Sequence, residues 1–132
     1  MTQRNIDVMD IIVSKMKEGT KLSKALKLVY NKRNVFVPYV EDNMDIDIRE
    51  LGMTGRSTNA LLRNGIRTIT DIIDFCTVQK ITKVKNLGVS SGIEVFETIL
   101  DYCWDHMNND ERTKFLIDTV ERNSEYIREE IA

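Results

Sequence analysis

Apolar residues recur at intervals of three and four along most of the chain, which is the spacing of amphipathic helices rather than strands. Near the start, one such stripe ends at Gly19 and a second follows it. The two stripes consist of Ile6, Met9, Ile12, Val13 and Met16, and then Leu22, Ala25, Leu26 and Val29. The pattern predicts an N-terminal helical pair, with the lysines at positions 21, 24 and 27 on the outer face of its second helix.

A short apolar run follows at residues 35–40, around the only proline of the sequence. This run is β-branched and aromatic, but it is too short and solitary to form a sheet, so we expect an extended connector. The acidic stretch Glu41–Asp47 is the candidate linker to the remaining residues.

From residue 46 the predicted helices are short and separated by glycines. One begins near Arg56 and stops at Gly65. Thr68 and Asp71 have the spacing of a capping box for the next helix. Its inward-facing residues are Ile69, Ile72, Ile73 and Phe75, and a further short helix covers about residues 78–84. The turn at residues 85–88 then leads into a long helix whose stripe is Ile93, Phe96, Ile99, Leu100, Cys103 and Met107.

The last predicted helix carries an apolar stripe with spacings of four, seven and four, formed by Leu116, Val120, Ile127 and Ile131. It either docks on the domain or pairs with a second copy, so a homodimer stays open. We therefore predict an all-α fold: a compact bundle of short helices with helix-hairpin-helix-like turns at residues 41–107. An N-terminal helical pair with its connector (1–40) and a C-terminal helix (108–132) flank this bundle.

Composition is typical of globular proteins, because 42% of the 132 residues are hydrophobic and 30% are charged. No uninterrupted apolar run exceeds three residues, far short of the roughly 20 that cross a bilayer. We expect a cytoplasmic protein that does not contact membranes, with Cys76 and Cys103 as free thiols.

The net charge of −2 is unevenly distributed. Residues 1–40 carry +5, residues 41–48 carry −4, residues 49–94 carry +3 and residues 95–132 carry −6. The basic segments favour an anionic partner, and the acidic tail is interpreted as a solvated surface.

No catalytic or metal-binding pattern is present in the sequence. His106, the only histidine, lies three residues after Cys103, but closed zinc sites need four ligands and Cys76 is the only other soft one. No nucleophile or acid lies in a motif beside His106. We expect no metal, no cofactor and no enzymatic activity.

Two tandem units have the pattern helix, glycine turn, helix: LLRNGIRTITDII and ITKVKNLGVSSGIEVF. Such a turn presents backbone N–H groups at a helix N-terminus, where the helix dipole favours phosphate oxygen. A single unit of this kind also occurs in proteins that never contact DNA, so the pair matters more than either copy.

The stretch IRELGMTGRSTNALLRNGIRTITDII, followed by KVKNLGVSSGIEVFETIL, resembles the C-terminal domain of the bacterial RNA polymerase alpha subunit. That family shows Arg-Ser-x-Asn at the start of its first helix, then Gly-Ile-x-Thr with a following Asp, then an Asn-Leu-Gly turn. All three occur here in order, over roughly residues 46–104.

The resemblance implies a domain that binds the minor groove of A·T-rich DNA. Arg56 holds the position of the arginine that enters the groove, where a weakly hydrated guanidinium suits the concentrated negative potential. The other positions that match the family's DNA-contacting residues are Asn59, Lys83, Gly88, Ser91 and Glu94. Without the motif, Arg56 is better explained as a solvated surface residue, and lysines such as Lys83 are more often solvated than bound to phosphate. The lysines of the second helix could form a second DNA contact, but the outer face of an amphipathic helix explains them better.

The sequence departs from the family at Val89 and Ser90, where lysines are frequent, so we expect weaker DNA binding with a flatter salt dependence. Just ahead of the position of Arg56, the family carries acidic residues that touch a sigma factor. Here only Glu50 is retained, and Gly52 replaces another of these acids. No segment resembles the assembly domain of the subunit, so we expect a stand-alone bacterial or phage transcription regulator or accessory factor, with RNA polymerase or a transcription factor as a further partner. The alternative is an adaptor, or an inhibitor of a nucleic-acid enzyme from a mobile element, that keeps the fold without binding DNA.

Overall fold

The computed structural model describes residues 1–31, 45–73, 81 and 83–131. The predicted all-α fold is confirmed: the described residues form helices and turns, and their only β pairing consists of two isolated bridges, Tyr30 with Ile127 and Asp47 with Thr68. The elements are α1 (Gln3–Lys17), α2 (Leu22–Val29), η3 (Ile48–Leu51), α3 (Gly55–Arg63), α4 (Ile69–Ile73), α6 (Gly88–Asp105), α7 (Asn109–Arg122) and η4 (Ser124–Tyr126).

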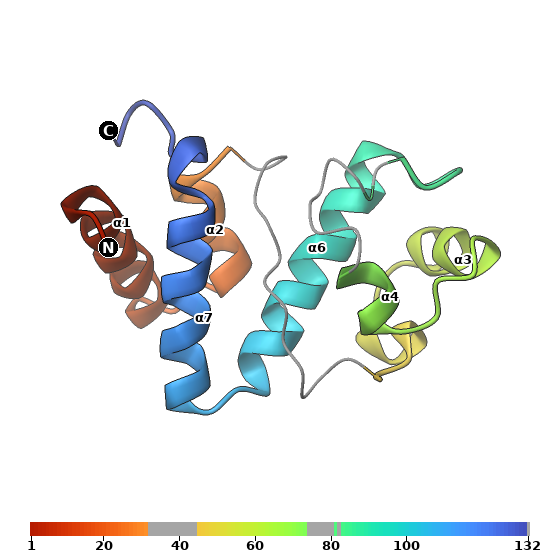
Figure 1. Cartoon of the computed structure of the whole chain (residues 1–132). Coiled ribbons are helices and arrows are strands. Elements are labelled where there is room, and N and C mark those ends of the chain that lie inside the picture. Colours follow the sequence, from red (N-terminus) through yellow and green to blue (C-terminus); the bar gives the residue numbers. More distant parts are fainter. Residues whose placement is uncertain (32–44, 74–80, 82, 132) are drawn as a thin grey trace.

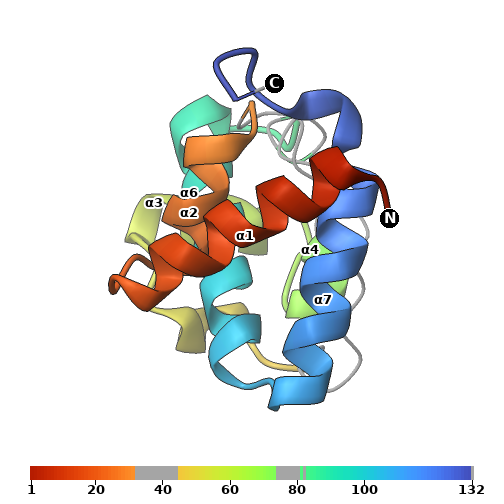
Figure 2. The same cartoon turned by 90° about the vertical axis from the view of Figure 1, so that its left-hand side faces the viewer.

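Helix α6 stands in the middle of the molecule (Figure 1). Helices α1, α2 and α7 lie on one side of it, whereas α3, α4 and η3 lie on the other. Figure 2 shows α1 crossing α2 and α7, and both of these helices contact it. The flanking helices therefore pack away from the side of α6 on which α3 lies.

One hydrophobic core joins the two sides through α6. Phe96 and Ile99 of this helix are almost completely buried, as are Leu26 of α2, Leu61 of α3 and Val120 of α7. Burying an aliphatic or aromatic side chain of this size stabilises the fold by about 1.5–3 kcal/mol. Helix α6 thus fixes the position of α3 relative to the flanking helices.

Helix α2 is held against α6 by polar contacts as well. Its N-cap residue, Lys21, provides no side-chain cap. Asp101 of α6 takes this role, because its carboxylate accepts hydrogen bonds from Ser23 N at 2.9 Å and Ser23 Oγ at 2.6 Å. Glu97, one turn earlier on α6, pairs with Lys27 and with Lys24, the latter at 3.6 Å. Two of the lysines on α2 therefore connect helices within the molecule, which favours the structural interpretation over a second DNA contact.

The predicted N-terminal pair is confirmed, with one correction to its inward face. Gly19 ends the first helix in a left-handed conformation, at φ +98°, as expected of a helix-stopping glycine. Ile6, expected in the apolar stripe, is 36% exposed. Asn5 and Val8 are buried instead, and the Asn5 amide donates to Ser124 Oγ at 2.8 Å, so the helix is rotated towards a polar contact that periodicity does not reveal.

The prediction of one long last helix is wrong. Helix α7 ends at Arg122, where Asn123 and Ser124 bond back to carbonyl groups of the preceding turn, as polar side chains do when they compete with the backbone ladder. The backbone then turns, and Ile127 forms a bridge with Tyr30, at the end of α2. Arg128 N donates to Val29 O at 2.8 Å, so the C-terminal segment docks on the same molecule.

The predicted turn chemistry in the middle of the sequence is confirmed. Gly65 has φ +76° and ends α3. Thr68 and Asp71 form the reciprocal capping bonds: Thr68 N donates to the Asp71 carboxylate at 3.2 Å, and Asp71 N donates to Thr68 Oγ1 at 3.4 Å. The expected connector at 35–40, residues 41–44 of the acidic linker, Phe75, and residues 78–80 and 82 of the helix expected at 78–84 fall outside the described residues. Among the helices that are described, none combines the length and the apolar character that a bilayer span requires.

Candidate nucleic-acid interface

Helix α3 presents one polar face to solvent. Thr54 caps the helix, since its Oγ1 accepts from Ser57 N at 3.3 Å. Ser57, Ala60 and Leu61 are buried, and Arg56, Asn59 and Arg63 are exposed. The exposed three are spaced by three and four residues, so they share one side of the helix.

Glu94 of α6 ties the beginning of α3 in place. Its carboxylate accepts from Thr54 Oγ1 at 2.9 Å, from Thr54 N at 3.5 Å and from the Ser57 hydroxyl. Ser57 is fully buried, so the loss of this acceptor would leave a buried hydroxyl with a poorer partner. Glu94 thus sets the position of the helix turn that carries Arg56.

Asn64 ties the other end of α3 to the turn before α6. Its side-chain amide donates to Lys85 O at 3.1 Å and to Ala60 O at 2.7 Å. Thr54 therefore lies beside Glu94 and Asn64 beside Lys85, so α3 runs antiparallel to residues 85–94.

The turn before α6 depends on left-handed backbone at two positions. Asn86 has φ +69° and Gly88 has φ +78°, a region that asparagine tolerates and glycine occupies freely. A Cβ built on Gly88 would meet no atom within 4 Å. Gly88 is therefore required for its conformation, and it leaves the backbone at the start of α6 open to solvent.

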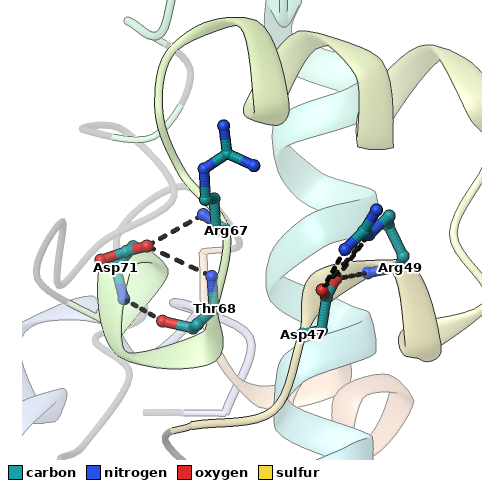
Figure 3. Close-up of polar contacts among 5 residues, drawn as sticks. All are labelled: Asp47, Arg49, Arg67, Thr68 and Asp71. Atoms are coloured by element: carbon teal, nitrogen blue, oxygen red, sulfur yellow. Dashed lines mark hydrogen bonds and ion pairs between the residues drawn. The ribbon is translucent and has the colours of Figure 1, made fainter.

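Three carboxylates of this region, those of Asp47, Asp71 and Glu94, are engaged in internal contacts, whereas several cations are not. Asp71 accepts from the backbone of Arg67 and Thr68, whereas the Arg67 guanidinium points away from it (Figure 3). Asp47 pairs with Arg49 at 2.6 Å, and this contact lowers the pKa of the Asp47 carboxyl to about 2. Five cations of this region form no hydrogen bond or ion pair with any described residue through their side chains: Arg56, Arg63, Arg67, Lys83 and Lys85.

The structure brings the six expected DNA-contacting residues onto α3 and the segment beside it. Arg56, Asn59, Lys83 and Gly88 are exposed, and Ser91 is partly exposed in the first turn of α6. Glu94 differs from the others, because its carboxylate is turned towards Thr54 and Ser57. Sequence reasoning did not single out Arg63, although its spacing from Arg56 and Asn59 places it on the same face.

Cys103 and His106 lie in different surroundings. Cys103 lies in the core, where burial raises its pKa to about 12. His106 is exposed and stacks on the Tyr102 ring with 4.1 Å between centroids. Within the described ranges, no group of three or more potential ligands could hold a metal ion.

Comparison with known proteins finds similarity in the middle of the sequence. Residues 38–101 match the family described as the C-terminal domain of the alpha subunit of bacterial RNA polymerase. This segment resembles that domain. Over 58 residues the protein is 34% identical to DNA-directed RNA polymerase subunit alpha of Mycoplasmopsis synoviae, which is 44% of its own length and 17% of that subunit. The same subunit of Fervidobacterium nodosum is 39% identical over 61 residues (46% and 18%), and that of Tropheryma whipplei is 29% identical over 65 (49% and 20%).

The protein thus spans a fifth or less of the length of these relatives. The alpha-C-terminal-domain-like segment, residues 38–101, includes α3, α4 and most of α6, but not α1, α2 or α7. No solved structure matches the sequence. The resemblance covers this segment alone.

Proposed function

We propose that this protein binds DNA through α3 and the N-terminal part of α6, with Arg56 in the minor groove of A·T-rich sequence. The observation that carries the proposal is the exposed Arg56 side chain, which forms no ion pair with a described residue and stands in the first turn of a helix that Glu94 of α6 holds in place. A narrow A·T-rich minor groove concentrates negative potential and attracts arginine. A guanidinium sheds its hydration more easily than an ammonium does.

In this proposal the residues near Arg56 have different roles. Asn59, one turn after Arg56 on the same face, contacts the groove wall, and Ser91 and the Gly88 amide meet phosphate oxygens at the start of α6. Lys83 neutralises a phosphate. Glu94 is a positioning residue, because it holds Thr54 and Ser57 at the N-terminus of α3.

The affinity should be modest. Val89 and Ser90, both exposed at the centre of this surface, carry no charge, so few phosphates are neutralised and the salt dependence is shallow. A protein of this kind would act in the cytoplasm as a stand-alone transcription regulator or accessory factor, with RNA polymerase or a transcription factor as a second partner.

A fluorescence-anisotropy titration at low salt tests the proposal, with duplexes of equal length that carry an A·T-rich or a G·C-rich centre. We expect tighter binding to the A·T-rich duplex. Arg56→Ala should cost at least about 1 kcal/mol and abolish the preference. Arg122→Ala, which removes a cation from α7, is the matched control and should bind like the unmodified protein. Equal binding by Arg56→Ala and the unmodified protein would reject the proposal.

A protein-interaction adaptor or inhibitor is the second candidate. It is favoured by the 42% exposure of Val89, an apolar side chain in the middle of the surface, and by the net charge of −6 in residues 95–132. Pull-down from a bacterial lysate with and without nuclease separates the two. Partners that survive nuclease, including polymerase subunits, support the adaptor, whereas loss of every partner supports DNA binding.

A further inference from the structure

A second group of cations lies at the far end of α3, away from Arg56. Arg63 is in the last turn of the helix, and Lys85 belongs to the turn that precedes α6. Both are exposed. The two positions are joined by Asn64, whose amide bonds the Lys85 carbonyl at 3.1 Å. We call Arg63 and Lys85 the distal cation pair.

The distal cation pair lies too far from Arg56 to share one crossing of a minor groove. Arg63 lies seven residue positions after Arg56 on the α-helix, a rise of about 10 Å at 1.5 Å per residue. The minor groove is only about 6 Å wide. If α3 crosses the groove with Arg56 inside it, Arg63 lies over the bordering phosphate strand.

The positive charge along this surface is concentrated at its two ends, with Arg56 at one end and the distal cation pair at the other. Between the ends, residues 89 and 90 on α6 and Asn59 on α3 are uncharged. Neither member of the distal cation pair has an acidic partner among the described residues. Its charge is therefore available to an external anion.

We infer that Arg63 and Lys85 form a phosphate-strand contact that adds affinity without sequence preference, distinct from the groove contact of Arg56. The inference rests on the proposed DNA binding. Asn64 is the positioning residue of this contact, because its amide holds the Lys85 backbone against the end of α3. Binding energy and sequence discrimination are then assigned to opposite ends of one helix.

The test is the salt dependence of DNA binding, measured by anisotropy between 50 and 150 mM KCl on A·T-rich and G·C-rich duplexes. The variant Arg63→Gln/Lys85→Gln keeps polar side chains but removes both charges. We expect its slope of log affinity against log salt to be shallower by about 1.8, because each neutralised phosphate contributes about 0.9. The affinity ratio between 50 and 150 mM should shrink about sevenfold. The preference for A·T over G·C should stay unchanged.

The control is Lys114→Gln/Arg122→Gln, which removes the same charge from α7 on the other side of α6. Its slope should equal that of the unmodified protein. A shallower slope in this control would show that total charge alone explains the loss in the distal variant. Far-ultraviolet circular dichroism checks that each variant is folded, and Arg63→Lys, which keeps the charge, should keep the slope.

The outcomes separate the two proposals. An unchanged slope in the distal variant, or a lost A·T preference, would overturn the phosphate-strand contact while the role of Arg56 stands. Equal slope losses in the distal and control variants would also overturn it. Absence of DNA binding by the unmodified protein, or binding unaffected by Arg56→Ala, would refute the proposed function, and the inference with it.

Discussion

Replacement of Glu94 by alanine should loosen the N-terminus of α3 and destabilise the protein. The mutation removes the acceptor for Thr54 Oγ1, at 2.9 Å, and for the buried Ser57 hydroxyl. A hydrogen bond to a charged group contributes about 1.5–3 kcal/mol where it is buried, and Glu94 is only half-buried, so we expect a loss of about 2 kcal/mol for the two bonds together. For a protein of this length, such a loss lowers Tm by about 7 °C.

Urea unfolding, followed by circular dichroism and by the fluorescence of Trp104, measures the effect. Glu94→Gln keeps one neutral acceptor oxygen and should lose about half as much stability. Asp105→Ala is the control on the same helix, because the structure gives the Asp105 carboxylate no partner among the described residues and its removal changes the charge equally. A Glu94→Ala variant within about 0.5 kcal/mol of the unmodified protein would refute the positioning role, as would an equal loss in Asp105→Ala.

Three further outcomes follow from the structure. Asp101→Ala should lose about 1–2 kcal/mol in urea unfolding, because Ser23 N at the start of α2 loses its acceptor, and a loss below about 0.3 kcal/mol would contradict this. In an NMR pH titration the Asp47 carboxyl should have its midpoint at about 2, rising towards its usual value near 4 in Arg49→Ala. Since the folded pKa is depressed, the pair stabilises the fold above about pH 4 and its contribution is lost as the pH falls through 2; a midpoint near 4 in the unmodified protein would disprove the pairing. In a Cys76→Ser variant, Cys103 should resist alkylation at pH 8 until urea is added, because its buried thiol has a pKa of about 12, and prompt native labelling would contradict its burial.

Local signals in the sequence predicted the elements around α3 well. Gly65, Thr68 and Asp71 act within a few residues of one another, so their roles in ending one helix and starting the next depend little on the rest of the molecule. The same holds for the stripe of α6, in which Phe96 and Ile99 are buried as expected. Motifs with a local mechanism are therefore predicted from sequence alone.

Periodicity failed where a polar contact between distant segments decides the outcome. The apolar positions 116, 120, 127 and 131 fit one helix, but Asn123 and Ser124 end α7, and Ser124 is engaged by Asn5 from the other end of the sequence. The same contact helps to turn Asn5, and not Ile6, towards the interior of the molecule. A pairing across 119 residues leaves no mark in the local pattern.

The carboxylates of α6 show most clearly why charge could not be assigned to a role from sequence. Glu94, Glu97 and Asp101 recur at three and four residues, which in sequence is the pattern of a solvated helix face. In the structure Glu94 holds the first turn of α3, Glu97 pairs with the lysines of α2, and Asp101 caps α2. An acid on such a face is solvated or structural depending on whether the N-terminus of another helix lies against it, and only the tertiary arrangement determines that. These acids of α6 are engaged, and the cations of α3 and of the turn that precedes α6 lack acidic partners among the described residues. This is the physical basis for proposing that these cations bind a polyanion.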